Sequence, residues 1–89
     1  MNIKFTWNQR KNIENALKHG VKFEDAQKAF FDQYRKIIKD EKHSKSEMRY
    51  FCYGKVEDEI LTVRFTIRKD TVRIFGAGLW RKGRKIYYE

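Results

Sequence analysis

The clearest hydrophobic pattern in this chain is a strict alternation of apolar and polar residues from position 60 to position 68. Successive side chains of a β-strand point to opposite faces, so the apolar members of this run share one face of a predicted strand. They are Leu61, Val63, Phe65 and Ile67. The opposite face carries Thr62, Arg64, Thr66 and Arg68. The pattern therefore predicts a strand with one buried face.

Two neighbouring segments have the same period of two. The aromatic-rich run 47–56 ends at the polar pair Glu57-Asp58, and residues 71–75 follow the turn-like pair Lys69-Asp70. These segments predict an antiparallel meander, with Gly76-Ala77-Gly78 breaking its last strand. A two-residue loop at 69–70 would pair Arg68 with Thr71, Thr66 with Arg73, Phe65 with Ile74 and Arg64 with Phe75. A slip of one residue would move Arg73 to the other face, so the register stays open.

The first third of the chain has helical spacing instead. Asn8 can cap a helix over residues 9–19, and Gly20 can end it in the left-handed conformation. The apolar residues of this helix share one face, which is expected to cover the sheet; they are Ile13, Ala16 and Leu17. A second helix over about 23–33 places Phe23, Ala26, Phe30 and Tyr34 at helical spacing.

Shorter segments complete the outline. Residues 2–6 alternate as a short strand would, and residues 34–39 contain the adjacent pair Ile37-Ile38 of an edge strand. A charged loop follows at 40–46. Residues 79–89 are basic and aromatic, and they form either a final turn of helix or an extended tail, because Gly83 weakens the helical interpretation.

Together these elements predict an α+β fold in which two N-terminal helices pack on an antiparallel sheet of roughly three to five strands, followed by a short C-terminal helix or tail. The 89 residues suit one domain over 1–89. An aromatic content of 16% is too high for a disordered chain. Cys52 has no partner for an internal disulfide and is expected in the core. No apolar run approaches the ~20 residues that cross a bilayer, so we expect a soluble cytoplasmic protein with no membrane partner.

Charge changes this picture more than any other property of the composition. There are 21 Lys and Arg residues against 12 Asp and Glu, a formal net charge of +9. Residues 61–89 alone carry eight basic and two acidic groups, a net +6. A polyanionic partner is implied, and the surface that binds it is expected towards the C-terminus.

The arginines of the predicted meander are the strongest sign of what that partner is. Arg64, Arg68 and Arg73 fall on one strand face, and no acid on those strands pairs with them. Such a row can be the solvent side of a half-buried sheet, but guanidinium groups also match phosphate oxygens two at a time. The interleaved aromatic residues offer stacking surfaces for unpaired bases; they are Tyr50, Phe75, Trp80, Tyr87 and Tyr88. Single-stranded RNA is therefore favoured over DNA.

Two histidines are candidates for proton transfer, because imidazole gains and loses a proton near neutral pH. His19 falls in the last turn of the first helix, where a favourable interaction with the helix dipole would equally explain it. His43 lies in a polar loop with Asp40 and Glu47 nearby in sequence, and it is either a general base or simply solvated. The two histidines are too few for a metal site, and Gly76-x-Gly78 lacks the remaining residues of a nucleotide fingerprint, so no metal or cofactor is expected.

Beyond these physical signals, the chain resembles the BrnT family of bacterial toxins. The first matching block is Phe5-x-Trp7-Asn8-x-x-Lys11-x-x-x-Asn15-x-x-Lys18-His19-Gly20-Val21-x-Phe23-Glu24-x-Ala26, followed by Phe31-Asp32. The central block is Asp40-x-x-His43-Ser44-x-x-Glu47-x-Arg49, and Gly54, Thr66-x-Arg68 and Arg73-Ile74 follow in order. Gly76-Ala77-Gly78 stands where the family commonly has Ser-Ala-Arg, and Arg84 where it has Glu, so no role is transferred to Gly78 or Arg84.

The resemblance implies a ribonuclease toxin with a RelE-like fold that inhibits translation by cutting RNA without a metal. Its partner would be a BrnA-like antitoxin with a ribbon-helix-helix domain, in a heterotetramer or larger assembly that binds operator DNA through the antitoxin. The alternative is a module that binds RNA or DNA through the same basic face without cutting it.

Residue roles follow from the basic face and the resemblance together. The expected catalytic residues are His19, Lys18 and Arg68, with His43 as the alternative proton-transfer group and Glu47 as a further candidate base. The expected RNA-binding residues are Arg64, Arg73, Arg81, Lys82, Trp80 and Tyr88.

Overall fold

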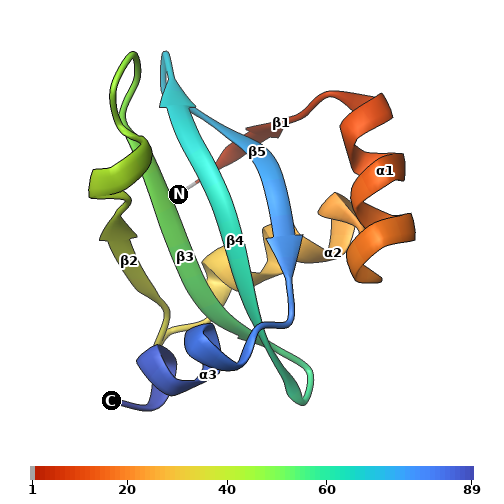
Figure 1. The fold of residues 1–89 in the computed structure, drawn as a ribbon, viewed down its shortest axis with the longest axis vertical. Coiled ribbons are helices and arrows are strands. Elements are labelled where there is room, and N and C mark those ends of the chain that lie inside the picture. The colour runs from red at the N-terminus through yellow and green to blue at the C-terminus, as the bar shows by residue number, and fades with distance from the viewer. Residues whose placement is uncertain (1) are drawn as a thin grey trace.

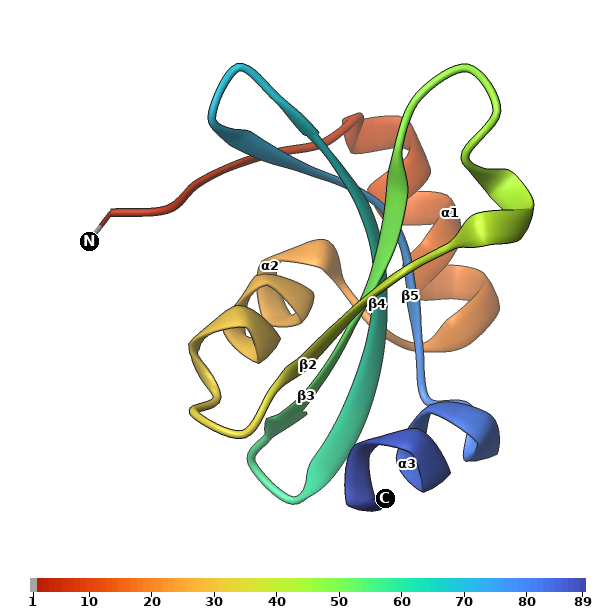
Figure 2. The ribbon, with the colours of Figure 1, turned by 90° about the vertical axis from the view of Figure 1, so that its left-hand side faces the viewer.

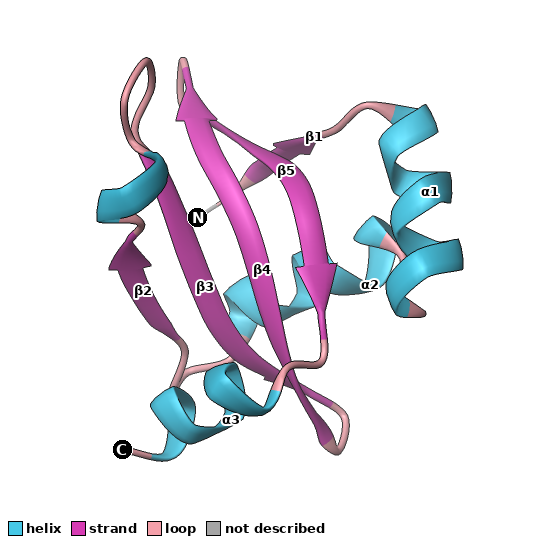
Figure 3. Cartoon of the chain, in the orientation of Figure 1, coloured by secondary structure: helices cyan, strands magenta, loops and turns pink. Residues whose placement is uncertain are grey.

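The computed structural model describes residues 2–89. In this part of the chain five strands form one mixed sheet, accompanied by three α-helices (Figures 1 and 3). The strands are β1 (Lys4–Thr6), β2 (Lys36–Lys39), β3 (Arg49–Val56), β4 (Glu59–Arg68) and β5 (Thr71–Gly78). The helices are α1 (Gln9–His19), α2 (Phe23–Ala26) and α3 (Arg81–Tyr88), with the 3-10 helices η1 (Gln27–Phe31) and η2 (Glu41–His43). None of the described helices is long and apolar enough to cross a membrane.

The prediction of an antiparallel sheet was wrong at one edge, because the sheet is mixed. Its strand order is β1-β5-β4-β3-β2, and β1 pairs in parallel with β5, Phe5 lying opposite Val72. The reason is the position of α1, which follows β1 directly. β1 pairs with the first residues of β5, and α1 lies beside the C-terminal end of that strand, where Asn15 contacts Ala77. The chain must therefore run along β5 in the direction of that strand. The three central strands form the predicted antiparallel meander.

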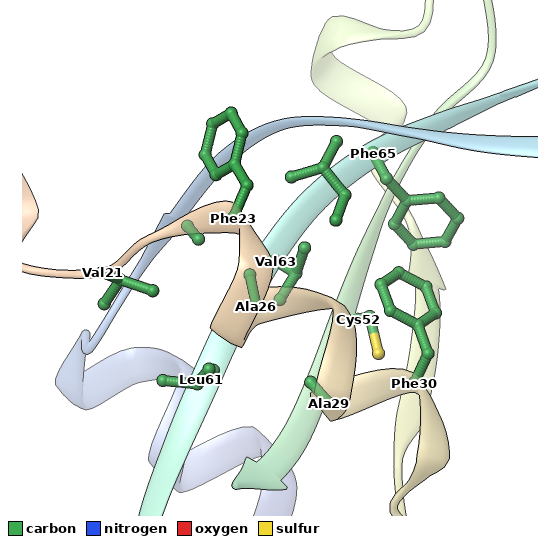
Figure 4. Close-up of a cluster of buried hydrophobic side chains, with 11 residues drawn as sticks. Val21, Phe23, Ala26, Ala29, Phe30, Cys52, Leu61, Val63 and Phe65 are labelled. Atoms are coloured by element: carbon green, nitrogen blue, oxygen red, sulfur yellow. The ribbon is translucent and has the colours of Figure 1, made fainter. Parts of the chain in front are cut away.

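Each face of the sheet is covered by different helices. Figure 2 shows α2 and η1 on one side and α1 and α3 on the other. The main core lies under α2 and η1, and Figure 4 shows most of it: Val21, Phe23, Ala26, Ala29, Phe30, Cys52, Leu61, Val63 and Phe65. The predicted inward residues of β4 are confirmed except Ile67, which is 55% exposed because it lies near the β4–β5 hairpin tip. Cys52 is buried as predicted, and burial raises the pKa of its thiol to about 12.

The second predicted helix is shorter and tighter than expected. Phe23, Ala26 and Phe30 point into the core as predicted, but the α-helix ends at Ala26 and continues as η1 to Phe31. A Cβ on Gly54 of β3 would lie 2.3 Å from the Ala29 carbonyl oxygen, so η1 packs directly on the strand backbone. Tyr34 lies outside the helix and is 70% exposed.

The β4–β5 hairpin confirms most of the predicted register. Lys69 and Asp70 both have positive φ, as in the two-residue turns that match strand twist, although neither is glycine. Thr66 pairs with Arg73 and Phe65 with Ile74, as predicted. A bulge between Arg64 and Phe65 then shifts the pairing, so that Arg64 lies opposite Gly76 instead of Phe75.

The strand also continues through the expected break. β5 runs to Gly78, with Ala77 paired to Val63 and Gly78 to Thr62. The prediction of a break at 76–78 was wrong because these glycines adopt extended backbone, and their pairing with β4 supplies the hydrogen bonds that a loop would lack.

The ends of α1 were predicted correctly, but its orientation was not. Asn8 caps the helix by accepting a hydrogen bond from the Lys11 backbone N–H at 3.1 Å, and Gly20 ends it at φ 72°. The apolar residues expected to pack inward face solvent instead, Ile13 being 54% and Leu17 84% exposed. Asn12 is the buried residue of this helix.

Two asparagine side chains explain this orientation. The Asn15 side chain donates to the Ala77 carbonyl at 2.9 Å and accepts from the Ala77 N–H at 3.2 Å, so it completes the free edge of β5 beyond β1. The buried Asn12 amide accepts from the Phe23 N–H at 2.8 Å and donates to the Glu24 carboxylate at 2.9 Å. These bonds hold α1 by its polar face, because buried backbone groups need hydrogen-bond partners.

The C-terminal segment is a helix rather than an extended tail. α3 packs through Tyr87 on Tyr53 and Ile60, on the face opposite the main core. The Tyr87 hydroxyl donates to the Asp32 carboxylate at 2.5 Å, and this bond raises the pKa of Tyr87 to about 12. Lys36 closes the helix end by donating to the carbonyls of Ile86 and Glu89, each at 2.7 Å.

Replacing Asn15 with alanine should lower the free energy of unfolding by about 1–3 kcal/mol, because it leaves the Ala77 N–H and carbonyl without partners. Urea denaturation measures this difference. The matched control is Leu17→Ala on the same helix, which should change stability by less than ~0.5 kcal/mol because Leu17 faces solvent. If Leu17→Ala proved the more damaging variant, this account of α1 would be wrong.

Candidate nucleic-acid interface

A groove of about 510 Å³ lies on the side of the sheet that carries α1 and α3. We call it the basic groove. The basic side chains that line it are Lys11, Lys18, His19, Arg49, Arg64, Arg68 and Arg73. Its other lining residues are Glu14, Asn15, Glu47, Thr66, Phe75, Gly76 and Trp80. Two carboxylates against six Lys and Arg residues leave the groove strongly positive, as phosphate binding requires.

The floor of the groove is the arginine face predicted from strand alternation. Arg64 and Arg68 come from β4 and Arg73 from β5, so the structure brings all three together. Arg49 joins them because the β3–β4 register places it opposite Thr66. No role for Arg49 was predicted from the sequence, although it stands in the central family-like block. Only the pairing of β3 with β4 shows that it shares this face.

Phe75 organises two of these cations. The guanidinium carbons of Arg49 and Arg64 lie 4.7 Å and 5.1 Å from the centre of its ring. A stacked guanidinium uses its flat face for the ring, so its N–H groups remain available in the plane. Within residues 2–89, the guanidinium groups of Arg49, Arg64 and Arg73 have neither an acidic partner nor a hydrogen-bond acceptor. These three cations can therefore take an anionic ligand.

Arg68 differs from the other arginines because it has an acidic partner. Its Nη2 lies 3.2 Å from Glu47 Oε2, and its Nε lies 3.3 Å from the same oxygen. The expectation of a wholly unpaired arginine row is thus wrong at this position. Glu47 precedes β3, outside the two strands that carry the arginine row, and the pairing of β3 with β4 brings it beside Arg68. The carboxylate orients Arg68 and partly neutralises it.

Helix α1 forms one wall of the groove. The residues of this wall recur at helical spacing; they are Lys11, Asn15, Lys18 and His19. Asn15 holds α1 on β5, so the same contact sets the positions of Lys18 and His19. The His19 ring meets the Trp80 ring edge-on, with centroids 5.1 Å apart. Trp80 in turn lies on Gly78, where a Cβ would fall 2.5 Å from the indole. The groove therefore contains four of the predicted catalytic residues, which are His19, Lys18, Arg68 and Glu47.

The remaining predicted site residues lie outside this groove. His43 and Lys82 line an adjoining pocket, which we call the aromatic pocket; its other lining residues are Phe51, Tyr53, Thr62, Arg64, Trp80 and Gly83. Arg81 lines a separate hollow with Asp58 and Glu59, and Tyr88 packs under the Arg84 guanidinium at 5.4 Å. For Arg81, Lys82 and Tyr88 the reason is that successive residues of the helix α3 turn through about 100° and cannot all face one groove, whereas His43 lies in η2.

His43 is held by a buried acid. Its Nδ1 lies 2.9 Å from Asp40 Oδ2, and the Asp40 side chain is 7% exposed. Asp40 also accepts the His43 backbone N–H at 3.3 Å, which begins η2. This contact fixes the orientation of the imidazole and leaves Nε2 as its free nitrogen. In the described part of the chain, no three His, Cys, Asp or Glu side chains group closely enough to hold a metal ion.

Comparison with protein families gives a match over residues 7–83, to the family described as the ribonuclease toxin BrnT of type II toxin-antitoxin systems. This range contains every residue that lines the basic groove. No curated protein sequence matches the chain.

Replacing Glu47 with glutamine should tighten binding of a single-stranded DNA oligonucleotide by about three-fold at low salt, because Arg68 loses its competing carboxylate. Fluorescence polarisation of a labelled oligonucleotide measures the affinity. Asp25→Asn is the matched control: it removes the same charge from α2, on the opposite side of the sheet, and should have a smaller effect. Equal gains for both variants would mean that net charge matters and the Arg68–Glu47 contact does not.

Proposed function

Because the chain belongs to the BrnT family of type II toxin-antitoxin ribonuclease toxins, we propose that its basic groove is the site that binds and cleaves RNA. One observation carries this proposal above the others. Cations without acidic partners and two groups able to transfer protons, His19 and Glu47, line the same groove. Phosphodiester cleavage needs cations that stabilise the charge developing on the phosphate, and it needs groups that accept and donate protons.

Arg64 and Arg73 are the groups that hold the phosphate in this proposal. Their guanidinium groups are not neutralised by acids in the described chain, and the Arg64 guanidinium already lies over the Phe75 ring. Such preorganisation matters because the phosphorane of the transition state carries more charge than the starting diester. Lys18 adds a further positive charge from the α1 wall. Arg68 joins them when a phosphate competes with Glu47 for its N–H groups.

The proposed cleavage uses the RNA's own 2′-hydroxyl and needs no metal. The 2′-oxygen attacks phosphorus while a base accepts its proton, and the bond to the 5′-oxygen breaks while an acid donates a proton to that oxygen. The products are a 2′,3′-cyclic phosphate and a free 5′-hydroxyl. We assign proton transfer to His19, with Glu47 as its counterpart, because both lie in the groove with the arginines.

His43 is the second candidate for proton transfer, supported by its contact with Asp40. A carboxylate on one ring nitrogen orients the imidazole and leaves the other nitrogen to exchange a proton with the substrate. His43 reaches the site from the other side of Arg64, which lines both the basic groove and the aromatic pocket.

Cutting RNA in this way would stop translation and make the free toxin harmful to its host.

His19→Ala and Arg64→Ala should each lower kcat/KM for RNA cleavage by about 100-fold or more, because each removes a group that acts on the reacting phosphate. Gel assays of a labelled single-stranded RNA measure the rate, and mass spectrometry identifies the cyclic phosphate. EDTA should leave the wild-type rate unchanged. Arg84→Ala, which removes the same charge from α3 outside the groove, should cleave normally.

The controls separate the possible failures. Thermal unfolding of each variant shows whether activity is lost with the fold intact. If His19→Ala unfolds the protein while Arg64→Ala cleaves normally, the catalytic assignment is wrong. If the wild-type protein shifts RNA in a salt-dependent way but never cuts it, the groove belongs to a binding module and the nuclease proposal falls.

We also propose that the antitoxin is a ribbon-helix-helix protein whose acidic or amphipathic segment lies across the basic groove. Membership of a type II family supports a protein antitoxin, and the excess of cations in the groove favours an acidic segment. Ile13 and Leu17 on the outer side of α1 supply exposed apolar contacts beside it. The dimeric ribbon-helix-helix domain would bind operator DNA and gather two toxins, which gives a heterotetramer or a larger assembly.

Co-expression with the product of the neighbouring open reading frame tests this partnership. Light scattering of the purified complex should give the mass of two toxins with two antitoxins or more, and the complex should no longer cleave RNA. Leu17→Asp should weaken the complex about ten-fold or more, since it places a charge in the apolar contact. A one-to-one complex that still cleaves RNA would contradict the proposed arrangement.

A further inference from the structure

The aromatic pocket adjoins the basic groove and has a similar volume, about 510 Å³. The two share Arg64 and Trp80, so a ligand that crosses from one to the other passes these side chains. The pocket differs in character from the groove, because three large aromatic residues line it and no acidic residue of the described chain does. A flat apolar group attached to an anion would fit this combination.

Three aromatic residues build the wall. Phe51 and Tyr53 lie two residues apart on the same face of β3, with ring centroids 5.7 Å apart and planes 25° from parallel. Trp80 comes from the start of α3 and rests on Gly78, where any larger residue would displace the indole. Trp80 is still 38% exposed as a residue, so a ligand can reach it.

Thr62 contributes an independent observation. Its residue is 5% exposed, and its Oγ1 is the one fully buried side-chain polar atom of residues 2–89 that has no hydrogen-bond partner. Buried hydroxyl groups normally have partners, because an unpaired one is destabilising. Thr62 lines the aromatic pocket beneath Gly83, where a Cβ would lie 1.9 Å from Oγ1, so Gly83 covers this hydroxyl and only a glycine fits against it.

We propose that the aromatic pocket binds one unpaired nucleobase of the RNA whose phosphate lies in the basic groove. This inference rests on the proposed function for the identity of the polyanion. Nucleobases have a flat face, which stacks on aromatic rings such as those of Phe51 and Trp80. Arg64 and Lys82 place positive charge at the pocket, which favours a nucleotide over an apolar side chain of a protein partner.

The substrate class follows from this arrangement. A base inside a duplex is stacked on its neighbours, so only single-stranded RNA, a loop or a bulge can place one in the pocket. The pocket also gives cleavage a preference for the base beside the cut phosphate.

Trp80 fluorescence reports the stacking directly. In a Trp7→Phe background Trp80 is the single tryptophan of the chain. Titration with each of the four ribonucleoside monophosphates should quench it, whereas ribose 5-phosphate, which has no base, should bind at least about ten-fold more weakly. Phe51→Leu keeps apolar volume but loses the aromatic ring, and it should weaken nucleotide binding about five-fold or more. Tyr34→Ala removes an exposed aromatic ring that lines neither the groove nor the pocket, and it should have no effect.

A second variant separates stacking on the pocket wall from the buried hydroxyl. Thr62→Val removes the unpaired hydroxyl at nearly constant volume, so the melting temperature should stay the same or rise. Because Gly83 covers that hydroxyl, quenching of Trp80 by nucleotides should be unchanged. Loss of quenching with the melting temperature unchanged would contradict stacking as the basis of base binding.

The outcomes distinguish this inference from the proposed function. If RNA is cleaved but no nucleotide quenches Trp80, the base subsite is wrong and the nuclease proposal stands. If nucleotides quench Trp80 but RNA is never cut, the subsite stands and the nuclease proposal falls. Quenching by the antitoxin and by no nucleotide would assign the pocket to the protein partner and overturn the inference.

Discussion

Amide side chains on one helix decide where the candidate site forms. Asn15 completes the free edge of β5 at Ala77, and Asn12 binds the start of α2. Because these bonds satisfy buried backbone groups, they outweigh the preference of Leu17 for the interior, and α1 lies with its polar face inward. The same orientation makes the helix a wall of the basic groove and leaves its apolar residues exposed beside it. Fold stability and site geometry thus depend on the same contacts.

The irregularity of β5 has a similar double role. The bulge at Arg64 places Gly76 opposite that arginine and leaves Phe75 under two guanidinium groups. Two residues later, Gly78 leaves space on the sheet for the Trp80 indole, which meets His19. Bulges commonly redirect side chains near functional sites. Here one bulge and two glycines of β5 set the positions of side chains from neighbouring elements, which are the cations over Phe75 and the Trp80 ring that contacts His19.

The arginines of the groove differ in whether an acidic residue pairs with them. Glu47 orients one arginine, whereas the cations stacked on Phe75 have no acidic partner in the described chain. Clustered cations repel one another, so the cluster destabilises the free protein and favours any polyanion that neutralises it. Under the proposed function, an RNA strand and an acidic antitoxin segment would both do so, and one surface would serve the substrate and the inhibitor in turn.

The sequence by itself determined the features that depend on neighbouring residues. The caps of α1, the alternation of β4, the two-residue turn at 69–70 and the shared face of Arg64, Arg68 and Arg73 were all predicted correctly, because spacing and local hydrogen bonds set them. Tertiary structure alone decided the parallel pairing of β1, the inward face of α1, the bulge, and the separation of His19 from His43 into adjoining cavities. The partners of these features lie far apart in the chain, as Asn15 and Ala77 do, and no local pattern reveals a hydrogen bond that forms only when the sheet and helix meet.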